Sequence, residues 1–239
     1  DSSNTKEYFS SSESSRTYPY FNKYINQITM YPIFSPAKLD IRIKILSNNK
    51  TFISPIYKFS SSSNKPLTIT VNDFVNLKKI KNVSAFSVVA TSKNNKIPTR
   101  INHQLVYGDI DKHNSIRCSI NLSLTNKKIF VPKKKTSFVW GQIINHKDYT
   151  SKLGICFKNL DGEEDKVKIS LYSDQGKIKT ISKKLLPSQS LIFDVNKILK
   201  NINKFNFCWY NAESKRSDLS AYSFHINKKS GNSSGEHNF

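Results

Sequence analysis

Hydrophobic and polar residues alternate with a period of two along several stretches of the chain. In residues 39–45, Leu and Ile occupy the odd positions, and Asp, Arg and Lys occupy the even positions between them. Residues 115–124 repeat the alternation, with Ile, Cys and Leu at the even positions. Because successive side chains of a strand point to opposite faces, this pattern predicts strands with one buried face. Further strands are predicted at residues 51–59, 67–71, 85–91, 101–107, 137–144, 152–157, 167–172, 177–181, 190–195, 205–210 and 219–226.

The segments between the predicted strands are short and rich in turn residues. Residues 174–176 (DQG) are a hairpin signal, and residues 75–81 and 196–204 are expected to form brief turn or helical links. No amphipathic helix longer than two turns is expected. Closely spaced strands without long helices predict an all-β fold of the sandwich type, either jelly-roll or Ig-like.

Two segments of the chain, residues 66–89 and 187–210, are similar to each other. Three identical residues coincide when one segment is shifted onto the other: Leu67 with Leu191, Val71 with Val195 and Asn72 with Asn196. The similarity predicts two tandem β-sandwich units related by internal duplication. We place a flexible polar arm at residues 1–16, the first unit at 17–112 and the second at 113–239.

The chain carries a formal net charge of +21, from 38 Lys and Arg against 17 Asp and Glu. A surface this basic favours an anionic partner, such as an acidic glycan, another polyanion or nucleic acid. Only five of the basic residues are Arg, on which phosphate recognition relies, so nucleic acid is the less favoured of these partners. The abundance of Lys, Asn and Ile also fits AT-rich codon usage, which would raise the charge without any binding role.

Several kinds of site and anchor are not predicted. The three cysteines, Cys118, Cys156 and Cys208, lack the CxxC spacing of a structural zinc site. The chain has no phosphate-binding loop, dinucleotide fingerprint or nucleophile elbow. No apolar run approaches the ~20 residues that a transmembrane helix needs. No cofactor is expected, and an extracellular, cell-surface or virion location is favoured over a cytoplasmic one.

Aromatic residues among basic ones are the first candidates for ligand binding. Residues 205–210 form the richest aromatic patch, although a strand with apolar residues on both faces is usually part of a core. Trp140 and Tyr210 are predicted to form a stacking platform, because Trp and Tyr rings stack on sugars and on bases alike. Arg100 and His103, from the segment IPTRINHQLVYGD, are further candidate binding residues, as is His225.

The five histidines suggest one candidate metal site. His225 lies in a predicted strand, and the tail returns with the pair Glu236 and His237. Two imidazoles and one carboxylate are a known ligand set for transition metals. The alternative interpretation is a tail whose histidine caps the sheet by hydrogen bonding.

These observations leave three functional hypotheses. The first is a non-catalytic β-sandwich that acts in binding or assembly at a cell or virion surface, with an acidic glycan, another protein or a second copy as partner. The second is a nucleic-acid-binding protein that uses the basic surface. The third is an enzyme with a His/Glu site at the C-terminal tail; the lack of catalytic motifs weighs against it without excluding it.

Overall fold

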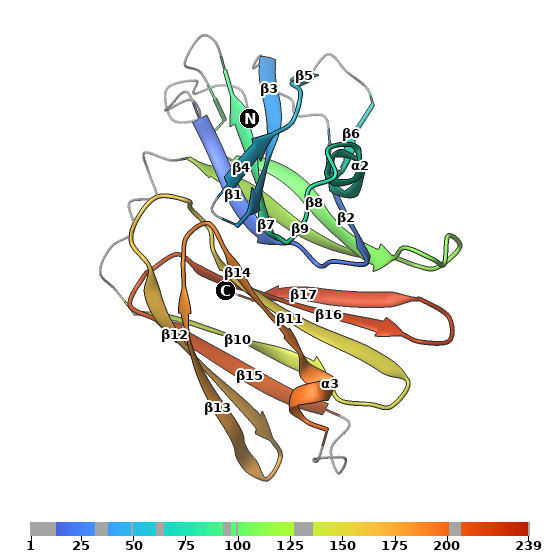
Figure 1. Cartoon of the computed structure of the whole chain (residues 1–239), viewed down its shortest axis with the longest axis vertical. Helices are drawn as coiled ribbons and strands as arrows, with labels where there is room; N and C mark the ends of the chain where they lie inside the picture. The colour runs from blue at the N-terminus through green and yellow to red at the C-terminus, as the bar shows by residue number, and fades with distance from the viewer. Residues whose placement is uncertain are drawn as a thin grey trace, which may run out of the picture.

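The computed structural model describes residues 13–31, 38–48, 50–60, 65–92, 97–98, 100–126, 136–200 and 207–238. Strand accounts for 66% and helix for 6% of these residues, which confirms the predicted all-β fold of the β-sandwich type. Figure 1 shows the sheets stacked in layers.

The first half of the chain, residues 13–126, forms a curled antiparallel sheet of nine strands (Figure 1). Its order is β4-β3-β7-β1-β9-β8-β2-β6, with β5 paired to β3. The strands are β1 (Glu13–Pro19), β2 (Tyr24–Met30), β3 (Lys38–Ser47), β4 (Lys50–Ile53), β5 (Tyr57–Ser60), β6 (Leu67–Thr70), β7 (Val83–Thr91), β8 (Arg100–Asp109) and β9 (Cys118–Asn126).

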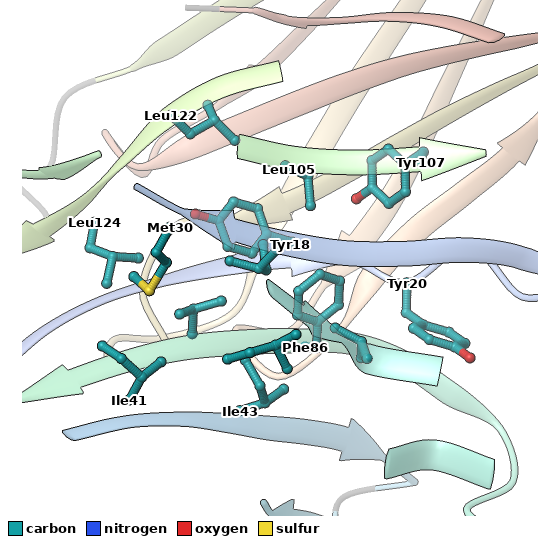
Figure 2. Packing of buried hydrophobic residues seen from close by; sticks show 14 of the residues in the cluster. Tyr18, Tyr20, Met30, Ile41, Ile43, Phe86, Leu105, Tyr107, Leu122 and Leu124 are labelled. Carbon is teal, nitrogen blue, oxygen red and sulfur yellow. The ribbon is translucent and has the colours of Figure 1, made fainter. Parts of the chain in front are cut away.

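The concave side of this sheet is filled by alternating apolar side chains. In β3, Ile41 and Ile43 point inward while Arg42 points outward, as the period of two predicts. They meet Tyr18 and Phe86 from the neighbouring strands in one buried cluster, part of which is drawn in Figure 2. The curl allows one sheet to cover its own core from two sides.

The second half, residues 137–238, forms two four-stranded antiparallel sheets, which we call the outer sheet and the middle sheet. The outer sheet has the order β10-β15-β12-β13, and the middle sheet has the order β14-β11-β16-β17. The strands are β10 (Ser137–Ile144), β11 (Tyr149–Phe157), β12 (Asp165–Ser173), β13 (Gly176–Leu185), β14 (Ser190–Asp194), β15 (Phe207–Ser214), β16 (Leu219–Asn227) and β17 (Ser233–Asn238).

The middle sheet lies between the nine-stranded sheet and the outer sheet (Figure 1). On one face, Tyr222, Phe224 and Ile226 of β16 belong to the core cluster of the first half. On the other face, Leu153 and Ile155 of β11 belong to the core cluster shared with the outer sheet. Both faces of the middle sheet are therefore buried, and the two halves share a continuous interior.

The two halves have the same strand order. We compare the strands in chain order, with β4 and β5 together taking the place of β13. On this basis, the group β4-β3-β7-β1 of the first half corresponds to β13-β12-β15-β10 of the second. The group β9-β8-β2-β6 corresponds to β17-β16-β11-β14. The difference is that β1 and β9 pair with each other, which joins the two groups of the first half into one sheet.

A hydrogen bond is also repeated between the halves. Asn72, in helix α2 (Val71–Leu77), accepts from the backbone N–H of Asn26 at 2.7 Å. Asn196, in helix α3 (Val195–Ile198), accepts from the backbone N–H of Ser151 at 2.7 Å. Asn72 and Asn196 are two of the residues that coincide in the sequence comparison, and β2 corresponds to β11. The internal duplication remains a prediction, which the shared strand order and this contact support.

The predicted boundaries differ from the observed strands at two places. Residues 13–16, assigned to the flexible arm, begin β1, which pairs with β7 and β9; the rest of the arm lies outside the described residues. β9, assigned to the second unit, pairs with β8 and β1, so the sheets divide after residue 126 rather than at residue 112. Serine side chains hid the alternation in β1, where Ser14 is fully buried.

The three cysteines are free and buried. Burial raises the pKa of Cys118 and that of Cys156 to about 12. Neither of these two thiols is therefore activated as a nucleophile at neutral pH.

Candidate functional site

The outward face of the outer sheet carries exposed aromatic side chains. In β15, Cys208, Tyr210 and Ala212 are buried against the middle sheet, which turns Phe207, Trp209 and Asn211 outward. In β10, Val139 and Ile143 are buried, which turns Phe138, Trp140 and Gln142 outward. Trp140 is 62% exposed and Trp209 is 42% exposed. Exposed aromatics gathered on one face of a sheet are typical of a binding surface.

Strand register aligns these side chains in rows across the sheet. One row runs from Gln142 on β10 to Trp209 on β15, Tyr172 on β12 and Lys177 on β13. The row beside it runs from Trp140 through Asn211 and Ser170 to Thr180. Neighbouring members of a row stand on strands about 4.8 Å apart.

The aromatic residues line a surface hollow of about 530 Å³. Within it, the rings of Tyr172 and Trp209 are parallel, with an interplanar angle of 7° and centroids 6.1 Å apart. Asn211 donates a hydrogen bond to the Tyr172 hydroxyl at 3.2 Å, which lowers the pKa of Tyr172. The Asn211 carbonyl oxygen has no hydrogen-bond partner among the described residues. The hollow is lined by Phe138, Trp140, Gln142, Tyr172, Trp209, Tyr210 and Asn211, all of them uncharged.

The β12 and β13 side of the same face is basic. Lys168 lies 3.8 Å from the Glu213 carboxylate, and Lys184 lies 2.5 Å from the Glu164 carboxylate. Lys177 places its Nζ 5.7 Å from the centroid of the Tyr172 ring. A second hollow, of about 370 Å³, is lined by Glu164, Asp165, Lys166, Ser182, Lys183 and Lys184. The outward face is therefore aromatic on β10, on β15 and at Tyr172 of β12, and it carries lysines along the rest of β12 and on β13.

The predicted metal site does not form. Glu236 lies opposite Ser223 and His237 lies opposite Tyr222, so adjacent residues of β17 point to opposite faces of the middle sheet. His225 shares the Glu236 face, and His237 contacts Arg16 on the other face. No group of three metal-ligating side chains occurs in the described part of the chain.

Glu236 and His225 instead contact the backbone of β10 at Gln142. The Glu236 carboxylate accepts a hydrogen bond from the backbone N–H of Gln142 at 2.6 Å. His225 Nδ1 lies 3.0 Å from the Ser151 hydroxyl. Burial lowers the pKa of His225 to about 4, although a hydrogen bond with the Gln142 backbone acts in the opposite direction. These two residues therefore fix the strand that carries Trp140.

The other predicted binding residues have different environments. Trp140 lies on the exposed aromatic face, whereas Tyr210 is fully buried and its ring is unavailable for stacking. His103 is 2% exposed and contacts the Tyr18 hydroxyl inside the first core, where burial lowers its pKa to about 4. Arg100 begins β8, and its side chain lies outside the described residues.

Sequence reasoning missed Trp209 as a surface residue and did not identify Tyr172, Asn211 or Lys177. The signal for Trp209 was that it lies four residues before Glu213 on the same strand, so that both side chains point to the same face. Because a carboxylate is rarely buried, the face of β15 that carries Glu213 is the solvent face. The same signal marks Tyr172, which lies on the same face of β12 as the exposed Lys168. No local signal marks Lys177, because a register shift between Leu171 and Tyr172 decides which residue of β13 lies opposite Tyr172.

Comparisons with known proteins do not assign a family. No protein-family model and no curated protein sequence matches the chain. Among solved structures, the M60 catalytic domain with the CBM51-1 and CBM51-2 domains from Clostridium perfringens ZmpB matches with a TM-score of 0.20 and 8% identity, over 86% of this chain and 33% of that one. The serine-rich repeat protein Srr2 from Streptococcus agalactiae matches with a TM-score of 0.22 and 7% identity, over 95% of this chain and 84% of that one.

The chain spans about a third of the length of the first of these structures. Both TM-scores are too low to support an argument about fold or function. Among the described residues, no helix is long and apolar enough to span a membrane.

Proposed function

We propose that the chain is a non-catalytic binding protein that acts at a cell or virion surface. It binds a glycan on the outward face of the outer sheet. The observation that carries this proposal is the hollow in which the parallel rings of Tyr172 and Trp209 lie beside the exposed Trp140. We further propose that the glycan is acidic, because the basic side of the face adjoins the hollow.

The chemistry of the hollow suits a sugar. A pyranose ring has an apolar face of C–H groups, which packs against indole and phenol rings, and a rim of hydroxyls that need hydrogen-bond partners. Gln142 supplies an exposed amide group beside the rings, and Asn211 also lines the hollow. Exposed Trp rings that stay solvated in the free protein become covered when such a ligand binds.

The position of the charges favours a glycan over a single-stranded nucleic acid. A nucleic acid places a phosphate beside every stacked base, so its binding groove needs cations along the whole aromatic track. Here the residues that line the aromatic hollow are uncharged, and the lysines lie on one side of it. The net charge of +21 is compatible with both ligands and does not decide between them.

The proposal is tested by removing the rings one at a time. Trp209→Ala and Trp140→Ala should each weaken glycan binding about 5- to 150-fold, because one stacking contact contributes about 1–3 kcal/mol. Calorimetry measures binding of acidic and neutral oligosaccharides and, in parallel, of single-stranded RNA. Sedimentation measures self-association of the protein. Tyr31→Ala, which removes a 47% exposed ring from the other half, is the matched control and should bind as the parent does.

The results separate the hypotheses. Glycan binding that survives the loss of both Trp rings contradicts the proposal. RNA binding or self-association that depends on the same rings, without glycan binding, would assign the face to a nucleic acid or to a second copy instead.

A further inference from the structure

We infer that the bound glycan lies across the strands of the outer sheet, with an acidic unit at Lys177. This inference rests on the proposed function and adds the direction of the ligand, its length and the residue that receives its carboxylate. It is carried by the strand register and by the position of Lys177 beside the Tyr172 ring.

The row Gln142–Trp209–Tyr172–Lys177 offers the required groups in sequence. An amide comes first, two parallel rings follow, and a cation ends the row. Its members stand on four adjacent strands, about 4.8 Å apart. That spacing is close to the width of one sugar ring, so successive units of a linear glycan can meet successive members of the row.

A bulge brings Lys177 into this row. The pairing of β12 with β13 shifts between Leu171, which lies opposite Lys179, and Tyr172, which lies opposite Lys177. The shift leaves Ile178 to pack against the inner core and turns Lys177 toward the Tyr172 ring. Bulges commonly re-aim a side chain in this way.

Lys177 is also available to an anion. Lys168 and Lys184 are each paired with a carboxylate on or beside the face. Lys177 forms no ion pair with any described residue, and it contacts the Tyr172 ring instead. A ligand carboxylate at Lys177 therefore displaces no existing salt bridge.

The direction along the strands is less suitable for an acidic glycan. From Trp209, β15 continues through Asn211 to Glu213, whose ion pair with Lys168 leaves no free cation for an acidic unit. From Trp140, β10 continues to Phe138, which offers no cation. The crossing row leads from the rings directly to Lys177, whereas along β12 the first lysine after Tyr172 is Lys168, which is already paired with Glu213.

The test uses sized oligogalacturonates of two to six units, together with the same oligosaccharides after reduction of their carboxyl groups. Affinity should rise from two units to about four and then stay level, because the row spans four strands. Lys177→Met should weaken oligogalacturonate binding about two- to fivefold and reduce its salt dependence, and should leave the reduced sugars unaffected. Lys184→Met, at a lysine of the same face that is paired with Glu164, should have a smaller effect than Lys177→Met. Lys58→Met, at an exposed lysine of β5 in the other half, is the matched control and should bind as the parent does.

Trp209→Ala separates this inference from the proposed function. It should weaken binding of both the acidic and the reduced series. If Trp209→Ala abolishes binding while Lys177→Met changes nothing, or if Lys184→Met has the larger effect, the crossing direction is wrong and glycan binding stands. If neither series binds, or binding ignores Trp209, the proposed function fails as well.

Discussion

Single buried polar side chains connect the two halves at their joint. Arg16 is 6% exposed and donates hydrogen bonds to the Ser123 carbonyl oxygen and the Ser220 hydroxyl, each at 3.4 Å. Its Nη2 also lies 2.6 Å from His237 Nε2, which must be unprotonated to accept from a guanidinium. Burial lowers the pKa of His237 to about 3, and the charge of Arg16 acts in the same direction. The joint is therefore built for a neutral histidine.

The buried histidines predict that acid destabilises the protein. The pKa of His103 and that of His225 are lowered to about 4 by burial, and that of His237 to about 3, whereas a histidine in the unfolded chain titrates near pH 6.5. As the pH falls below 6.5, the unfolded chain binds protons that the folded chain does not, so the free energy of unfolding decreases. Each such proton contributes up to about 1.4 kcal/mol per pH unit. Urea denaturation at steps between pH 7.5 and 5 measures the slope.

Substitution of single histidines tests whether the buried imidazoles cause this decrease in the free energy of unfolding. His237→Asn should make the decrease shallower, because one of the suppressed protonation sites is gone. Leu77→Ala, at an exposed side chain that does not titrate, should leave the pH profile unchanged. A free energy of unfolding that stays constant from pH 7.5 to 5 would contradict the expectation.

At the scale of elements, the two short helices act as supports for neighbouring strands. α2 follows β6 and α3 follows β14, and each begins with a buried valine followed by an asparagine that binds back to a strand. In each case the asparagine side-chain oxygen accepts from a backbone N–H that lies directly beyond the last residue paired with β6 or β14. Such an N–H, left buried without a partner, is unfavourable. This requirement explains why the same Val–Asn pair stands at both sites.

The repeated contact predicts matched effects of substitution. Asn72→Ala and Asn196→Ala should each lower the free energy of unfolding by about 1–3 kcal/mol, because each removes the acceptor of a strand N–H. Asn196→Asp keeps an acceptor oxygen and should recover much of the loss. Chemical denaturation measures all three variants. Loss of stability in only one of the Ala variants would show that the two helices do not play the same role.

At the scale of the whole molecule, the middle sheet joins the two halves through a shared core. Phe224 packs against Phe21, with ring centroids 5.7 Å apart, and against Tyr107, with centroids 5.4 Å apart, both from the first half. Gly154 of β11 lies so close to Pro19 that an added Cβ would come within 2.7 Å of its ring. The second half thus covers the open side of the first core.

A shared core predicts one cooperative unfolding transition. Calorimetry should show a single peak, and Phe224→Ala should move that whole peak to lower temperature, with a loss of about 3–5 kcal/mol. Leu77→Ala, at a side chain that is 77% exposed, is the control and should leave the peak in place. Two peaks, of which only one responds to Phe224→Ala, would mean that the halves unfold independently.

The sequence determined the class of fold and most of the strands, because alternation of apolar and polar residues is a local property. Residues 39–45 and 167–172 lie within β3 and β12 as predicted. β1, β2 and β17 were not predicted as strands, since Ser, Gly and Pro obscure the alternation in them or beside them. The all-β character did not depend on these strands.

Only the tertiary structure decided which faces are exposed. Trp209 and Tyr210 are neighbours in the sequence, yet one ring is on the surface and the other is buried beneath the middle sheet. Likewise, Glu236 and His237 are adjacent but lie on opposite faces of that sheet, so the predicted metal site is divided. A strand pattern specifies two faces, but the sheet that covers one of them comes from a distant part of the chain. The candidate site therefore follows from packing between layers, which no local pattern contains.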